Sequence, residues 1–134
     1  MNGFEATNKV DVTEQEVVTG EEDEDTVYQV RGKLFTMSSQ NTWKEKGTGQ
    51  LKLNVRREDG EGARLLMRKE AVYTVLLNAP LFKGMSVLLA QDPRYLRFGV
   101  LENGVTRHYN FRVPSAKIAE ELLEEINSHI PGDD

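Results

Sequence analysis

Between residues 26 and 113 the chain is divided by turn signals into segments of strand length, and this division most limits the folds open to it. Residues 50–57 alternate apolar and polar side chains with the two-residue period of a half-buried strand. Asp59-Gly60 and Asn103-Gly104 are typical of tight turns between antiparallel strands. We therefore expect strands at residues 28–37, 42–46, 50–57, 63–69, 72–78, 86–90, 95–101 and 105–113.

The period changes after Pro114, where apolar residues recur at the 3.6-residue spacing of a helix. Ser115 suits the N-cap, and Pro131-Gly132 is expected to end the helix. The apolar stripe consists of Ile118, Ala119, Leu122, Leu123, Ile126 and Ile130. A single amphipathic helix is not stable alone in water, so its stripe must cover another element.

Seven or so short strands followed by one helix predict a mainly β domain with one α-helix. The simplest arrangement is a seven-stranded antiparallel barrel or sandwich that is capped by the C-terminal helix, which is the pleckstrin-homology-like architecture. A length of 134 residues suits a single domain with its own core. We divide the chain into an acidic, largely disordered N-terminal arm (1–25), a folded domain (26–131) and a tail (132–134).

The formal net charge of -5 conceals a strong segregation of charge along the chain. Residues 1–25 hold nine acids and one lysine and end in the acidic run 21–25, whereas residues 26–112 carry a net charge of +8 and residues 113–134 one of -5. Two interpretations remain open: the chain binds a partner with both a basic patch and an acidic segment, or the arm folds back on its own basic body. Nucleic acid is a weaker candidate, because the arm would repel phosphates.

Several classes of function are disfavoured by what the sequence lacks. Cysteine is absent, which excludes disulfides and thiol catalysis. His108 and His129 are the only imidazoles, and neither belongs to a recognisable catalytic or metal-binding pattern. No apolar run approaches the roughly 18 residues of a membrane span. We expect no enzyme, no cofactor and no metal site.

Three motifs in order give the chain its resemblance to a known family. The first is Thr19-Gly20-Glu21-Glu22-Asp23-Glu24, running into Lys33-Leu34-Phe35. The second is Trp43-Lys44-Glu45-Lys46-Gly47-Thr48-Gly49, followed by Leu51-Lys52-Leu53. The third is Ala63-Arg64-Leu65-Leu66-Met67-Arg68, followed by Leu76-Leu77-Asn78. With these motifs the chain resembles the Ran-binding domains from about residue 17 to residue 130.

The resemblance implies a module that binds the GTP-bound form of the small GTPase Ran. In this family the acidic arm reaches a basic patch on Ran, and a basic groove receives the acidic C-terminal tail that Ran releases in its GTP state. Carried over, the arm contacts are Glu21, Glu22 and Asp23, and the groove residues are Trp43, Lys44, Lys46, Lys52, Arg64, Met67, Arg68 and Asn78.

Some of these residues also have a purely structural interpretation. Trp43 is the single tryptophan and would suit a core equally well. Met67 points inward by strand parity if Leu65 does. Gly47 and Gly49 are expected to set the geometry of a turn rather than to touch a partner.

The motifs are more similar to the nuclear members of the family than to the cytoplasmic ones. We expect a nucleoporin with a C-terminal Ran-binding domain, located at the nuclear pore complex, and keep a nuclear export cofactor as the alternative. The resemblance also implies importin or exportin as further partners, through regions absent from this sequence. We expect a monomer. A lipid-binding or proline-rich-peptide-binding module ranks lower, since residues 38–41 lack the cations of a phosphate clasp and the aromatic residues are scattered.

Overall fold

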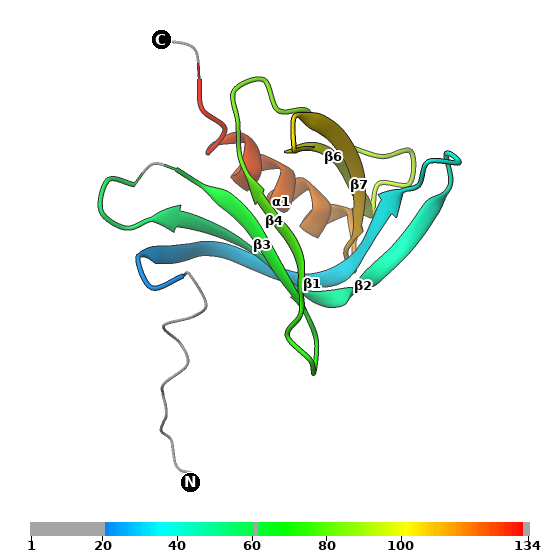
Figure 1. The fold of residues 1–134 in the computed structure, drawn as a ribbon, viewed down its shortest axis with the longest axis horizontal. Helices are drawn as coiled ribbons and strands as arrows, with labels where there is room; N and C mark the ends of the chain where they lie inside the picture. Colours follow the sequence, from blue (N-terminus) through cyan, green and yellow to red (C-terminus); the bar gives the residue numbers. More distant parts are fainter. Residues whose placement is uncertain (1–20, 61, 133–134) are drawn as a thin grey trace, which may run out of the picture.

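The computed structural model describes residues 21–60 and 62–132. One antiparallel sheet with the strand order β4-β3-β2-β1-β7-β6-β5 is followed by a single helix, α1 (Figure 1). The elements are β1 (Glu24–Met37), β2 (Trp43–Arg56), β3 (Arg64–Lys69), β4 (Val75–Pro80), β5 (Val87–Leu89), β6 (Tyr95–Glu102), β7 (Val105–Arg112) and α1 (Ala116–Asn127). The expected fold class is confirmed. Most of the predicted arm, residues 1–20, lies outside the described residues, as do residues 133 and 134.

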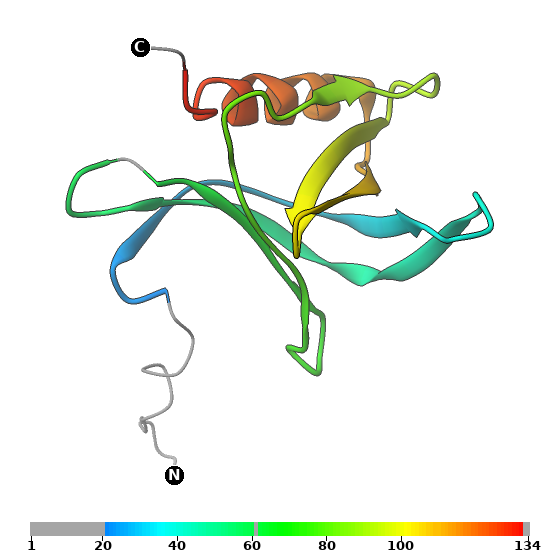
Figure 2. The same cartoon turned by 45° about the horizontal axis from the view of Figure 1, so that its top comes forward.

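The two longest strands connect the two halves of the sheet. β1 pairs with β2 from Glu24 to Met37, and it also pairs with β7 through residues 33–36. The sheet curves along these strands, so that β3 and β4 lie toward one end and β6 and β7 toward the other, while α1 lies over the concave side (Figure 2). The helix packs against β5 and β6, as expected for a capping helix.

The core is built from the inward-facing rows of the strands and the apolar stripe of the helix. Leu51 and Leu53 on β2 and Leu65 on β3 are at most 1% exposed, as the alternation in the sequence predicts. Ala119, Leu122 and Ile126 of α1 close the core from the other side. Burial of this apolar surface is the main stabilising contribution to the fold.

The helix begins as predicted but ends earlier. The Ser115 side chain accepts a hydrogen bond from the Ile118 N–H at 3.3 Å, which is the geometry of an N-cap. α1 ends at Asn127, four residues before Pro131. The N–H groups of His129 and Ile130 bond the carbonyls three residues earlier, so a tighter turn replaces the last part of the predicted helix.

The prediction of two separate strands at residues 42–46 and 50–57 is wrong, because β2 runs unbroken through both. The glycines between them set the path of a strand, not of a turn. Gly47 has a φ of 154° and lies where the register with β1 shifts. At Gly49 a Cβ would overlap the carbonyl oxygen of Arg68 on β3. Both glycines thus allow neighbouring segments to approach closely.

Two other boundaries also differ from the prediction. β4 begins at Val75 rather than at residue 72, because Ala71 and Tyr73 have φ values of 73° and 61° and form the β3–β4 turn. β1 begins at Glu24, four residues earlier than predicted, where it pairs with Arg56 of β2. The sheet therefore includes the last two residues of the segment assigned to the arm.

Replacing Gly49 with alanine should destabilise the fold by about 2 kcal/mol, since the new methyl group would push β2 away from β3. Urea unfolding of the Gly49→Ala variant would measure this loss. Gly132→Ala is the matched control, because a Cβ at Gly132 meets open space, and its stability should equal that of the parent. Equal stability of both variants would contradict the close approach at Gly49.

The turn between β5 and β6 should make stability depend on acidic pH. The side chain and backbone N–H of Arg94 hold the pKa of Asp92 at about 2, below its ordinary value of 3.8. Because the folded-state pKa is the lower one, the carboxylate stabilises the fold above pH 4 and loses this effect as the pH falls toward 2. The free energies of unfolding of Asp92→Asn and the parent, measured by urea denaturation, should differ at pH 6 and converge near pH 2. A difference that is independent of pH would contradict this account.

Candidate functional site

Three cations gather on the outer face of β2 and β3, on the side of the sheet away from the core. The register pairs Gln50 with Arg68 and Asn54 with Arg64, which brings the outward rows of both strands together. We call the surface formed by Lys52, Arg64 and Arg68 the basic face. The side chains of Arg64, Arg68 and Lys52 are 18%, 28% and 38% exposed, so water only partly solvates their charges.

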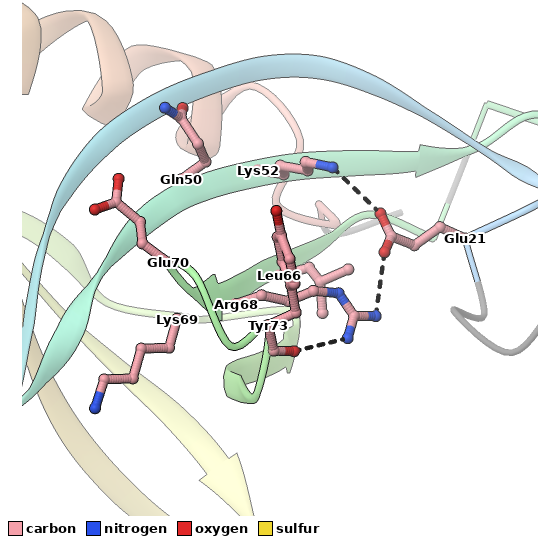
Figure 3. A pocket seen from close by; sticks show the side chains of 8 residues that line it. All are labelled: Glu21, Gln50, Lys52, Leu66, Arg68, Lys69, Glu70 and Tyr73. Atoms are coloured by element: carbon pink, nitrogen blue, oxygen red, sulfur yellow. Dashed lines mark hydrogen bonds and ion pairs between the residues drawn. The ribbon is translucent and has the colours of Figure 1, made fainter. Parts of the chain in front are cut away.

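Two carboxylates at the root of the arm lie on this basic face. One Glu21 oxygen is 3.2 Å from Nη2 of Arg68 and the other is 3.7 Å from Nζ of Lys52, so the side chain bridges the two strands (Figure 3). Glu24 lies 3.0 Å from Nε of Arg64. The charge pattern left open whether the acidic arm binds a partner or folds back on the basic body. For Glu21 and Glu24, the structure shows the second arrangement.

Asn54 positions both carboxylates. Its side chain lies on the outward row of β2 yet is only 1% exposed. The amide oxygen accepts a hydrogen bond from the Thr26 hydroxyl at 2.7 Å, and the amide nitrogen donates to Glu24 at 3.1 Å and to Glu21 at 3.4 Å. Asn54 was not among the site residues predicted from the sequence. One feature of the sequence could have indicated it: asparagine is depleted in strands, yet here it stands in the middle of a regular strand and between cationic positions.

The β4 strand adds one more predicted residue to this group. Asn78 pairs with Leu66 of β3, and its amide oxygen accepts a hydrogen bond from Nη1 of Arg64 at 3.1 Å. The structure thus brings together five of the predicted site residues. They are Glu21, Lys52, Arg64, Arg68 and Asn78.

The other two predicted arm residues, Glu22 and Asp23, have exposed side chains in the turn before β1. Arg57 fixes the backbone of this turn: its guanidinium donates to the Glu22 carbonyl at 3.2 Å, and its backbone N–H donates to the Asp23 carbonyl at 2.7 Å. The turn therefore has a defined path, and both of these acids are presented on its outside.

Trp43, Lys44 and Lys46 form a second group, at the beginning of β2. The Trp43 ring is partly exposed and carries the Arg97 guanidinium 5.3 Å from its centre. Lys46 donates a hydrogen bond to the Leu76 carbonyl at 3.1 Å. Six residues separate Lys46 from Lys52 along β2, roughly 20 Å. The exposed groove residues predicted from the sequence therefore fall into two groups, one on the outer face of β2, β3 and β4 and one at the beginning of β2.

Lys46 lies beside a buried tyrosine. Its ammonium is 5.8 Å from the centre of the Tyr109 ring, whose hydroxyl donates to Glu102 at 2.7 Å. Burial, reinforced by the Glu102 carboxylate, raises the pKa of Tyr109 well above its ordinary value. Tyr109 therefore remains a neutral hydrogen-bond donor that holds this end of the sheet together.

Met67 does not belong to the surface. Its side chain is 0% exposed and packs in the core with Leu65, as strand parity required. The expectation that Met67 contacts a partner is wrong, because no atom of its side chain is accessible.

A pocket of about 200 Å³ adjoins the basic face, beside the β3–β4 turn. It is lined by Glu21, Gln50, Lys52, Leu66, Arg68, Lys69, Glu70 and Tyr73 (Figure 3). Within residues 21–60 and 62–132, no three histidine, aspartate or glutamate side chains gather as metal ligands would. Over the same described ranges, no helix has the length and apolar character needed to cross a membrane.

Comparison with known proteins gives several similar sequences. The chain is 39% identical to the "Brefeldin A resistance protein" of Schizosaccharomyces pombe over an alignment 130 residues long, which covers 90% of this chain and 33% of that protein. It is 34% identical to "Ran-specific GTPase-activating protein 2" of Saccharomyces cerevisiae, over 87% of this chain and 38% of that protein. "Nucleoporin nup61" of S. pombe is 32% identical over 94% of this chain and 23% of its own length. The chain thus spans between 23% and 38% of the length of these relatives.

Among solved structures, the Ran-binding domain of the nuclear complex component Nup2 from Ashbya gossypii has a similar fold. The TM-score is 0.74 at 22% sequence identity, and the match covers 81% of this chain and 96% of that one. At this identity the likeness concerns the fold, and it confirms the expected pleckstrin-homology-like architecture.

The family assignment rests on the sequence match. The family model of the RanBP1 domain matches residues 16–126, which include all three motifs and the whole basic face. The resemblance drawn from those motifs is confirmed, and the chain belongs to the RanBP1 family of Ran-binding domains.

Proposed function

We propose that this chain binds the GTP-bound form of Ran as the Ran-binding module of a nuclear pore protein, and that it serves nucleocytoplasmic transport at the pore without catalysing a reaction itself. The observation that carries the proposal is the basic face, where three partly buried cations hold two carboxylates of the chain's own arm. A surface that already binds carboxylates suits the acidic C-terminal tail that this family receives from Ran. Relatives named as a nucleoporin and as a Ran-specific protein support the same context.

Binding proceeds by an exchange of carboxylates. Acidic residues of the tail replace Glu21 and Glu24 on Lys52, Arg64 and Arg68, so no partly buried cation is left without a counter-charge. The displaced arm root, together with Glu22 and Asp23, then contacts a basic patch on the body of Ran. The exchange therefore replaces the ion pairs of the basic face one for one, and the displaced acids add new ones with Ran.

Selectivity for the nucleotide follows from which form of Ran offers its tail. A module that binds only the released tail favours the GTP conformer by its difference in affinity for the two forms. Trp43, Lys44 and Lys46, roughly 20–30 Å from Lys52 along β2, provide a second contact for the segment that leads to the tail.

Reversing the charge of the basic face should abolish most of the affinity for Ran. We expect the double variant Arg64→Glu, Arg68→Glu to bind Ran loaded with a non-hydrolysable GTP analogue more than tenfold more weakly, measured by calorimetric titration. The parent should prefer this form to Ran-GDP by a hundredfold or more. Lys117→Glu on the exposed side of α1 is the matched charge reversal and should leave affinity unchanged. Ran without its acidic tail should bind parent and double variant equally, and a remaining difference would refute the tail as the occupant.

Removing the resident carboxylates should have opposite effects on two ligands. In the double variant Glu21→Gln, Glu24→Gln, a detached acidic peptide should bind several-fold more tightly, because it no longer competes with the arm root. Intact Ran-GTP should bind more weakly, because arm contacts are lost. Fluorescence anisotropy of a labelled peptide measures the first effect and titration with Ran the second. Asp23→Asn, in the same exposed turn, is the control for the peptide. Unchanged peptide affinity in the double variant would contradict the exchange.

A further inference from the structure

The pocket beside the basic face has an apolar floor that does not belong to the core. Leu66 is only 3% exposed although it lies on the outward row of β3, between the inward-facing Leu65 and Met67. Its side chain is therefore largely covered by groups of the outer face, and it lines the pocket together with Arg68 and Tyr73. An apolar floor beneath a ring of charges is a surface that water solvates poorly.

One wall of this pocket is formed by Tyr73, whose side chain is exposed to solvent. Tyr73 is 70% exposed, and its backbone has a φ of 61°, which non-glycine residues seldom adopt. The turn around it is fixed: the Tyr73 N–H donates to the Lys69 carbonyl at 2.8 Å, and the Lys69 N–H donates to the Thr74 carbonyl at 2.7 Å. A rigid turn that presents an exposed tyrosine is typical of an interaction surface.

Charged side chains lie directly beside the apolar floor of the pocket. Glu21 bridges Lys52 and Arg68 at the edge of the pocket, and Arg68 also donates to the Tyr73 carbonyl at 3.5 Å (Figure 3). The pocket holds about 200 Å³, which is less than the roughly 300–1,000 Å³ of a site for a drug-sized ligand, so its size suits one side chain.

We propose that this pocket receives a single aliphatic side chain of the same acidic segment that binds the basic face. The inference rests on the proposed function and adds the chemistry of the partner: carboxylates on Lys52 and Arg68, and next to them a residue of leucine size between Leu66 and Tyr73. Charge complementarity identifies the occupant. The lining holds the cations Lys52, Arg68 and Lys69, and of its two carboxylates Glu21 is displaced in the proposed exchange and Glu70 is paired with Arg31, so the cations favour a segment whose remaining residues are acidic.

This subsite gives the surface selectivity that its cations cannot provide. Ion pairs with partly exposed cations are weakened by salt and accept any carboxylate within reach. An aliphatic side chain in the pocket instead adds apolar burial that salt does not screen. Acidic segments with and without such a residue are then distinguished even where their charge is the same.

Three labelled peptides with the same five carboxylates test the proposal. One has a leucine before the acidic run, one has it after the run, and the third has serine in place of leucine. We expect at least one leucine peptide to bind the domain tenfold or more tightly than the serine peptide, measured by fluorescence anisotropy. In Tyr73→Asn this advantage should fall below threefold, and the affinity for Ran-GTP should fall by about tenfold.

The variants are chosen to separate binding from folding. Asparagine tolerates the left-handed backbone at position 73, so Tyr73→Asn removes the ring without straining the turn. Val72→Asn is the matched control, because Val72 is 63% exposed in the same turn but does not line the pocket. It should retain the full advantage of leucine. Thermal unfolding should give the same midpoint for both variants.

The outcomes distinguish this inference from the proposed function. If Ran-GTP and the serine peptide bind but neither leucine peptide binds better, the subsite is refuted and the basic face stands. If Val72→Asn reduces the advantage as much as Tyr73→Asn, the pocket is also refuted as its source. If Ran-GTP binds but no acidic peptide does, the subsite fails together with the basic face as the site of the tail. If Ran-GTP itself does not bind, the proposed function fails.

Discussion

The pairing of β1 with β2 over their whole length determines where the other parts of the molecule lie. At one end this ladder sets Glu24 opposite Arg56 and so directs the root of the arm across β2 and β3. At the other end it sets Met37 opposite Trp43, which places the second group of predicted contacts. The same two strands supply the inward row that α1 closes. A shift of one residue in this register would exchange the core row for the basic face.

The cations of the basic face need counter-charges in the isolated domain. Arg64 and Arg68 are less than a third exposed, and partly buried cations without partners are costly. Glu21 and Glu24 supply the missing charge, and Asn54 holds them in position. Acids at the root of the arm and cations of the basic face are therefore partners of each other within the isolated domain.

Local pattern was sufficient to predict much of the fold. The alternation at residues 50–57 gave the correct inward row, Ser115 gave the start of the helix, and the parity of Leu65 gave the true place of Met67. The continuity of β2 was not predictable from the sequence. Gly49 is needed because the carbonyl of Arg68, a residue distant in sequence, lies where a side chain would be. Asn54 was missed for the same reason: its role exists only once Thr26, Glu21 and Glu24 lie around it.

The buried amide of Asn54 makes the basic face sensitive to spacing as well as to charge. Its nitrogen donates to the very oxygens that an incoming ligand would displace. A ligand that pairs with all three cations but brings no oxygen to this point leaves a buried donor unsatisfied, at a cost of about 1–3 kcal/mol. Under the proposed exchange, a bound chain must therefore bring an oxygen to Asn54 as well as carboxylates to the guanidinium groups, and this requirement limits the spacing of its acids.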